Sequence, residues 1–191
     1  MIFGEQALTK EKMGSRELGL VLTQQILGVD DLHYGLWDSD LELKLSNLGI
    51  AQQRYTDNMI AAMPSPQPGP VKVLDIGCGT GHNLAMLGRF GKVDAIEVDA
   101  EARAFAEKRT GRPVSSAPLP ALPGIERGHY DLVAALDVVE HIADDRAAVE
   151  ALASCLKPGG KLLVTVPAHQ WMWSAHDELN HHKRRYSKRG L

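Results

Sequence analysis

Three glycines and two acids form the most informative pattern of this 191-residue chain. Residues 73–81 read VLDIGCGTG, with Asp75 ahead of the glycines, and Glu97 follows twenty positions after Gly77. Glycine permits positive φ and a close approach of the backbone to a ligand. An acid at that distance can accept hydrogen bonds from both hydroxyls of a ribose. We therefore expect a nucleoside cofactor at this loop.

The residues around the loop discriminate between two nucleoside cofactors. A dinucleotide site of the pattern GxGxxG would place its third glycine at position 82, where the chain has His82. The carboxylate of Asp75 would face the charge of a diphosphate, whereas it suits the ammonium and sulfonium groups of S-adenosylmethionine. The carboxylate of that cofactor can lie at a helix N-terminus. The residue chemistry favours S-adenosylmethionine over a dinucleotide and over a purely structural glycine turn.

A second group of residues that could do chemistry lies later in the chain. His141 follows Asp137 closely, and four more histidines come later, at positions 169, 176, 181 and 182. Methyl transfer from a sulfonium mainly requires alignment of the reacting atoms and exclusion of water. A base is needed only if the acceptor carries a proton at neutral pH. We expect His141 and Asp137 to be the catalytic residues.

These residues fall on an alternation of strands and helices that begins at Val71. Strands are expected at 71–76, 93–98, 130–137 and 161–166, with a weak one at 113–116. Helices are expected at 83–90, 100–109 and 144–156, and Pro158 to Gly160 is predicted to be a turn. Such alternation predicts an α/β fold with a doubly wound, mostly parallel sheet and helices on both faces. Ligands bind beside the first strand–helix turn of such sheets, where the glycine loop falls.

The chain divides by pattern into four stretches. Residues 1–63 show helical periodicity, at 18–27 and again at 41–63, and are expected to form a helical extension or cap. Residues 64–70 (PSPQPGP) form a stiff linker, and residues 71–168 the α/β core. Residues 169–191 are aromatic and basic. Trp171, Trp173 and Tyr186 could form walls of a lid over the acceptor, with polar contacts from His176, Asp177 and Arg185, or the tryptophans could pack on the sheet edge.

The core motifs resemble those of class I S-adenosylmethionine-dependent methyltransferases. The matching stretches are VLDIGCGTG, VDAIEVD, YDLVAALDVVEHI and LKPGGKLLVTVP. The resemblance implies a Rossmann-like fold and a cofactor site made of Asp75, Gly77, Cys78, Gly79, Gly81, Glu97, Val98, Ser116, Asp137 and Tyr34.

Within that site the resemblance implies separate tasks. Glu97 would bind the ribose and Val98 would flank the adenine, while Tyr34, in an HYG-type loop, would cap the cofactor. Ser116 stands close to the position where many members have an acid for the adenine amino group. Asp137 would face the methionine amino group or the acceptor. Because the chain reaches Leu191 soon after its fifth strand, we expect the usual C-terminal strand pair of the family to be lacking.

The run DVVEH at 137–141 resembles an element of some metal-assisted O-methyltransferases, including ubiquinone-pathway and small-RNA 2′-O-methylating enzymes. The resemblance implies carboxylates and histidine around Mg²⁺, Mn²⁺ or Fe²⁺, which would lower the pKa of an acceptor hydroxyl. Members without a metal share such sequences, in which the residues are a general base or ordinary polar residues of a loop. We expect no metal ligands here and leave the divalent cation as the alternative.

The composition of the chain limits the kinds of partner molecule that we expect it to bind. The net charge is −3, so no general attraction to nucleic acid or anionic membrane is expected. The exception is a basic cluster at 181–189, which is either a solvated surface or a means of recruitment. The two cysteines give no disulfide framework, and neither a signal peptide nor an apolar span of about 18 residues is present. We therefore expect a cytoplasmic protein.

The expected function is methyl transfer to a small-molecule acceptor, at oxygen. No Asp-Pro-Pro-Tyr motif follows the fourth strand, which disfavours methylation of nucleobase or amide nitrogen. Two alternatives remain open at this point. One is a non-catalytic or truncated module that binds S-adenosylmethionine. The other is a lipid-headgroup or RNA methyltransferase recruited by the basic cluster, although no RNA-binding domain accompanies the core.

Overall fold

The computed structural model describes residues 71–187 without a gap, and nine separate positions between Asp40 and Ala61. The chain divides into two compact units, Met1–Ala62 and Met63–Leu191. In the first unit every described position from Ile50 to Ala61 is helical, and Arg54 forms a bidentate ion pair with Asp40 at 2.8 Å. The predicted helix at 18–27, Tyr34 and the proline linker lie outside the described residues.

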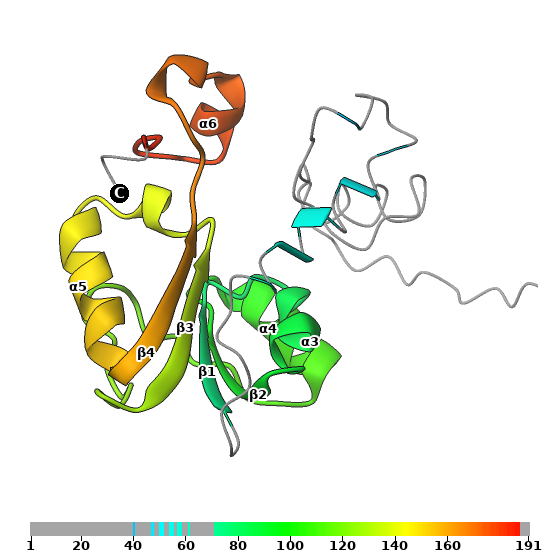
Figure 1. Ribbon diagram of the computed structural model, residues 1–191, viewed down its shortest axis with the longest axis vertical. Helices are drawn as coiled ribbons and strands as arrows, with labels where there is room; N and C mark the ends of the chain where they lie inside the picture. Colours follow the sequence, from blue (N-terminus) through cyan, green and yellow to red (C-terminus); the bar gives the residue numbers. More distant parts are fainter. Residues whose placement is uncertain are drawn as a thin grey trace, which may run out of the picture. The chain divides into compact units, whose positions relative to one another are not determined.

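The second unit is built on a parallel sheet with the strand order β2–β1–β3–β4 (Figure 1). The strands are β1 (Val71–Ile76), β2 (Gly91–Ile96), β3 (Tyr130–Leu136) and β4 (Leu156–Thr165). One parallel bridge, from Ile96 to Ser115, extends the sheet beyond β2 where the weak strand was predicted. The strand order turns back beside β1, so the predicted doubly wound α/β class is confirmed.

Helices cover both faces of the sheet (Figure 1). Leu87 of α3 (Asn83–Leu87) packs on one face against Val73 and its neighbours. Leu152 of α5 (Asp145–Cys155) packs on the other face against Leu74. Because side chains alternate along a strand, successive residues of β1 enter opposite layers of the core. The helix α4 (Ala100–Thr110) begins where Asp99 accepts the N–H of Ala102 at 2.8 Å.

The predicted boundaries need three corrections. The strand predicted at 93–98 is β2, which begins and ends two residues earlier, at Gly91 and Ile96. The helix α3 ends at Leu87, earlier than predicted, because Gly88 follows and the chain turns toward β2. The expected turn at Pro158 to Gly160 is wrong, since these residues lie inside β4. Leu156 pairs with Tyr130 and Lys161 with Leu132, so the intervening residues form a bulge. Gly159 has φ +82° in this bulge, a conformation that glycine adopts without strain.

After β4 the chain forms η3 (Gln170–Met172) and α6 (Ala175–Leu179), then returns to the core. Within the described residues this stretch contributes one isolated bridge, between Ala168 and Tyr186, in place of a strand pair. Lys183 N–H donates to the carbonyl of Glu140 at 2.7 Å, which ties the returning chain to the loop after β3. No helix in the described part of the chain is both long enough and apolar enough to cross a bilayer.

Candidate functional site

The glycine loop connects β1 to α3 and runs through left-handed backbone conformations. Gly77, Gly79 and Gly81 have φ of +67°, +54° and +86°. A Cβ added at Gly77 would lie 2.6 Å from a methyl carbon of Val138, so the loop after β3 leaves no room for a side chain there. At Gly79 an added Cβ would meet no described atom within 4 Å. The loop backbone is therefore open to a ligand at Gly79.

Glu97 is held against this loop by backbone donors. Its side chain is buried, one carboxylate oxygen accepts the N–H of Gly79 at 2.8 Å, and the other accepts the N–H of Asp99 at 2.8 Å. Carboxylate oxygens have two lone pairs each, so both oxygens can accept further hydrogen bonds from the hydroxyls of a ribose. The spacing of Glu97 in the sequence corresponds to direct contact with the loop in space.

Asp75, at the end of β1, is a buried carboxyl whose Oδ2 has no hydrogen-bond partner among the described residues. Burial, with a contribution from the negative charge of Glu97, raises its pKa to about 8. A cationic ligand nearby would favour the ionised form. Asp75 therefore fits a cofactor with ammonium and sulfonium charges better than a diphosphate. Cys78 is buried beside it, and burial raises the pKa of its thiol to about 12.

The expected adenine contacts lie next to Glu97. Val98 is 61% exposed, and Ser116 is also exposed. The backbone N–H of Glu97 donates to the carbonyl of Ser115 at 2.8 Å, so Ser116 directly follows the residue that pairs with Glu97. Val98 and Ser116 are therefore both exposed in the two segments that meet at Glu97, and their contact with adenine stays a prediction.

Asp137 directly follows β3, which ends at Leu136, at the same edge of the sheet as the glycine loop. It is exposed, has φ +55°, and accepts a hydrogen bond from the hydroxyl of Thr165 at 3.1 Å. Its neighbour Val138 is the residue that a side chain at Gly77 would strike. The structure therefore brings Asp137 to the loop after β1, although the two segments are far apart in the sequence.

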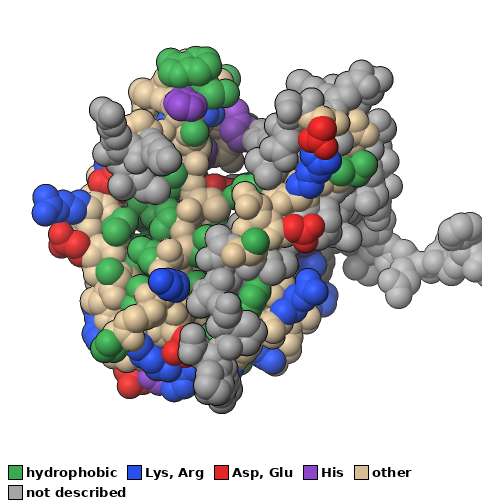
Figure 2. Space-filling model, in the orientation of Figure 1, with side chains coloured by type: hydrophobic (Ala, Val, Ile, Leu, Met, Phe, Trp, Pro, Cys, Tyr) green, Lys and Arg blue, Asp and Glu red, His purple; other side chains and the backbone are tan. Residues whose placement is uncertain are grey.

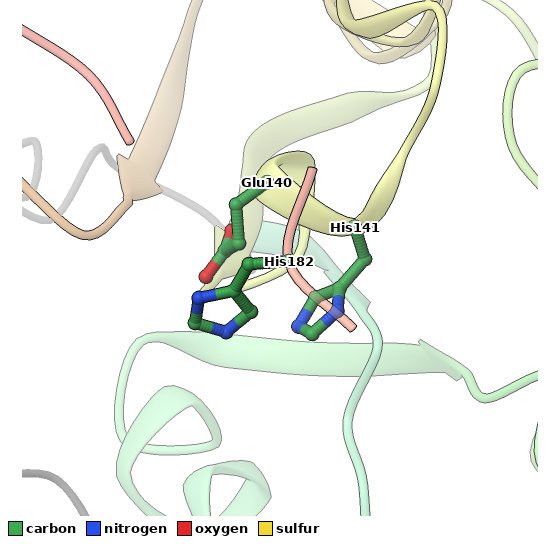
Figure 3. Close-up of side chains that lie close together, drawn as sticks. All are labelled: Glu140, His141 and His182. Atoms are coloured by element: carbon green, nitrogen blue, oxygen red, sulfur yellow. The ribbon is translucent and has the colours of Figure 1, made fainter. Parts of the chain in front are cut away.

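A second cluster lies just beyond Asp137. Glu140 and His141 belong to η2 (Val139–His141), and His182 joins them from the returning chain after α6 (Figure 3). One possible ligand atom from each residue lies within 4.8 Å of those of the other two. The rings of His141 and His182 meet edge to face, with centroids 4.8 Å apart. The sequence analysis named His182 as one of four histidines late in the chain and did not predict its contact with Glu140. No local spacing in the sequence connects the two residues.

The carboxylate of Glu140 is the unusual member of this cluster. It is completely buried, and neither oxygen has a hydrogen-bond partner among the described residues. Burial raises its pKa to about 7, and the negative charge of Asp137 contributes to the rise. A buried ionised carboxylate is strongly unfavourable unless a proton or a cation compensates it. One carboxylate with two imidazoles is also a donor set that divalent metals accept.

The C-terminal segment differs in part from the expected aromatic lid. Tyr186 is buried in the core, and its hydroxyl donates to Asp145 at 2.9 Å, so its expected place in an aromatic wall is wrong. Trp171 is 81% exposed, which excludes the alternative that it packs on the sheet edge. Figure 2 shows apolar and histidine side chains at the surface of this segment. The imidazole of His169 stacks on Trp171.

Comparison with known proteins identifies the family to which the chain belongs. A family model described as a methyltransferase domain matches residues 49–189. A ubiquinone biosynthesis O-methyltransferase of Xanthomonas axonopodis is 32% identical over 136 residues, which are 68% of this chain and 54% of that protein. The human mitochondrial protein of the same name is 32% identical over 57% of this chain and 33% of its own length. The chain thus spans about half, or less, of these relatives.

Solved structures agree on the fold. Geranyl diphosphate C-methyltransferase from Streptomyces coelicolor, solved with Mg²⁺ and S-adenosyl-L-homocysteine, has a TM-score of 0.65 and 15% identity, over 89% of this chain and 70% of that one. The [4+2]-cyclase SpnF has a TM-score of 0.54 and 23% identity, over 80% and 60%. The second likeness shows that this fold also serves another reaction. With the family model covering most of its length, the chain belongs to the class I S-adenosylmethionine-dependent methyltransferases.

Proposed function

We propose that the chain transfers the methyl group of S-adenosylmethionine to a hydroxyl oxygen of a small molecule, assisted by a divalent cation at Glu140, His141 and His182. The observation that carries this proposal is the buried carboxylate of Glu140, which has no hydrogen-bond partner in the described structure and faces two imidazoles. A cation would compensate the buried charge, and the donor set suits one. His141 would then be a ligand, where the sequence suggested a general base.

The cofactor residues would act at the neighbouring strand ends. The backbone from Gly77 to Gly81 and the carboxylate of Asp75 would hold the methionine part, and Glu97 would accept the ribose hydroxyls. Val98 and Ser116 would flank the adenine. Asp137 lies between the glycine loop and the histidine cluster, and would orient the amino group of the cofactor or the acceptor.

The chemistry required of the protein is modest. The bond between the methyl carbon and sulfur breaks as the bond to oxygen forms, S-adenosylhomocysteine leaves, and the hydroxyl proton is released. When bound, a divalent cation would lower the pKa of the acceptor hydroxyl. The protein aligns the oxygen with the methyl group and excludes water, which are the main requirements when the leaving group is already activated.

Two further observations support a small acceptor and transfer to oxygen. Several relatives are named as ubiquinone biosynthesis O-methyltransferases. In addition, two arginines of the basic cluster are engaged within the chain: Arg184 pairs with Asp145 at 2.8 Å and Arg185 with Asp177 at 2.7 Å. These two arginines are therefore committed to internal carboxylates, which weakens the alternative of recruitment to RNA or lipid headgroups.

The test uses catechol as a probe acceptor, because its two adjacent hydroxyls can coordinate one cation. Product and S-adenosylhomocysteine are measured by mass spectrometry with Mn²⁺, with Mg²⁺ and with a chelator. Glu140→Gln is compared with Glu150→Gln, which changes an exposed residue of α5 that pairs with Arg146. We expect Glu140→Gln to bind S-adenosylmethionine normally and to lose roughly 100-fold or more of the methyl transfer. Transfer that resists both the chelator and Glu140→Gln would refute the proposal.

A further inference from the structure

Asp177 is a buried carboxylate outside the cluster of Glu140, His141 and His182 that contacts one of its members. The side chain has no exposed surface, and its Oδ1 lies 2.9 Å from Nδ1 of His182. Arg185 binds the same carboxylate with two donors, Nε at 2.7 Å and an Nη at 2.9 Å. Ser174 adds its backbone N–H at 2.9 Å and its hydroxyl at 3.2 Å. The carboxylate thus accepts hydrogen bonds from Arg185 and Ser174 and also lies against the ring of His182.

These donors keep Asp177 ionised. The charge-assisted hydrogen bonds from Arg185, with the backbone N–H and hydroxyl of Ser174, stabilise the ionised form of this carboxylate. An ionised carboxylate can only accept hydrogen bonds, so Nδ1 of His182 must carry the proton of the bond between them. In the neutral ring the lone pair then lies on Nε2. A metal ligand or proton acceptor needs one ring nitrogen with a lone pair.

We propose that Asp177 is a positioning residue: its carboxylate, held by Arg185, fixes His182 in the Nδ1–H tautomer and so supplies Nε2 of that ring to the cluster with Glu140 and His141. This inference rests on the proposed function, in which His182 takes part. With Asp177 in this role, the segment after β4 contributes residues to the active site and is more than a lid over the acceptor. Carboxylates that orient metal-bound histidines through the other ring nitrogen act in this way.

A purely structural role for Asp177 is the competing explanation, because the same carboxylate anchors the segment through Arg185. Asp145 provides the matched control. It anchors the same segment through Arg184 at 2.8 Å and through the hydroxyl of Tyr186 at 2.9 Å, and no hydrogen bond joins it to His182 in the described structure. Asp145→Asn therefore weakens the attachment of the segment and leaves the partner of Nδ1 in place.

The direct measurement is the tautomer of His182, from long-range ¹H–¹⁵N correlation spectra of the metal-free, substrate-free protein with labelled histidine. Spectra are recorded above the pH at which the ring loses its charge, and His182→Gln assigns the signals. We expect Nδ1–H in the wild type and in Asp145→Asn. In Asp177→Asn the introduced amide can donate to Nδ1, so we expect the proton to move to Nε2.

The second measurement is functional. Asp177→Asn should weaken Mn²⁺ binding and slow methyl transfer to catechol by about 10–100-fold, with unchanged affinity for S-adenosylmethionine. Combining it with His182→Gln should add no further loss, because Asp177 acts through that ring. Losses that multiply in the double variant would indicate a structural role and overturn the inference.

The two proposals fail in different ways. Nε2–H in the wild-type protein, or a tautomer unchanged by Asp177→Asn, overturns the positioning role even if His182→Gln loses activity. Full methyl transfer by His182→Gln instead removes the proposed function of the cluster, whatever the tautomer is. The wild-type spectrum needs only His182→Gln, for assignment, so the inference can be tested even if Asp177→Asn fails to fold.

Discussion

Replacing Glu140 by glutamine should stabilise the metal-free protein at alkaline pH while it removes activity. The pKa of this carboxyl is raised from 4.5 to about 7, so the folded protein binds the proton more tightly than the unfolded chain. That stabilising contribution is complete below about pH 4.5 and is lost as the pH rises through about 7. At pH 8 the folded protein must therefore hold an uncompensated buried charge.

The magnitude follows from the same values. A shift of one pKa unit corresponds to about 1.36 kcal/mol, so the rise of the Glu140 pKa from 4.5 to about 7 corresponds to about 3 kcal/mol. The glutamine amide remains buried without partners, which costs part of this gain. We expect Glu140→Gln to raise the free energy of unfolding by about 2–3 kcal/mol at pH 8 and to change it little at pH 4.5. For a domain of this size the gain corresponds to about 4–12 °C in melting temperature.

The assay is urea unfolding followed by circular dichroism, with a chelator present, at pH 4.5 and pH 8. Glu150→Gln changes the same chemical groups at an exposed site and should stay within about 0.5 kcal/mol at both values. Excess Mn²⁺ should stabilise the wild type at pH 8 and leave Glu140→Gln unchanged. A destabilised Glu140→Gln at pH 8, or an equal effect at both pH values, would show that Glu140 is not an uncompensated buried charge.

Three further predictions concern the cofactor loop and its surroundings. Glu97→Ala should lose S-adenosylmethionine binding in calorimetric titration, with NAD⁺ as the control ligand; retained micromolar affinity would remove Glu97 from the ribose site. Gly77→Ala should destabilise the protein by more than the roughly 1–2 kcal/mol of a positive φ, and by more than Gly79→Ala, because only the first meets a clash at 2.6 Å. Equal losses in urea unfolding would contradict the packing of the loop after β3 on Gly77. Burial raises the pKa of both thiols, so Cys78 and Cys155 should resist iodoacetamide at pH 8 and react in urea; rapid labelling of the native protein would show that they are accessible.

The fold and the conformation of the glycine loop were largely predictable because they depend on local patterns. A few neighbouring residues are enough to predict each of three features. These are the apolar pattern of β1 and β3, the positive φ between Val73 and Gly81, and the acid after β2. The boundaries were less predictable. Gly159 and Gly160 are typical of a turn, yet they form a bulge within β4. Pairing of β4 with β3 stabilises this arrangement by more than the local preference of the two glycines for a turn.

The sequence by itself determined the family, the glycine loop and Glu97, because these follow from residue type and short spacing. Only the tertiary structure decided the partners of the late residues. His182 joins Glu140, Arg185 binds Asp177 and Tyr186 enters the core because the chain after β4 returns to the loop after β3. No spacing rule predicts that return, since it depends on which segments bury each other. The raised pKa of Glu140 likewise arises from burial by distant segments, which residue type alone does not encode.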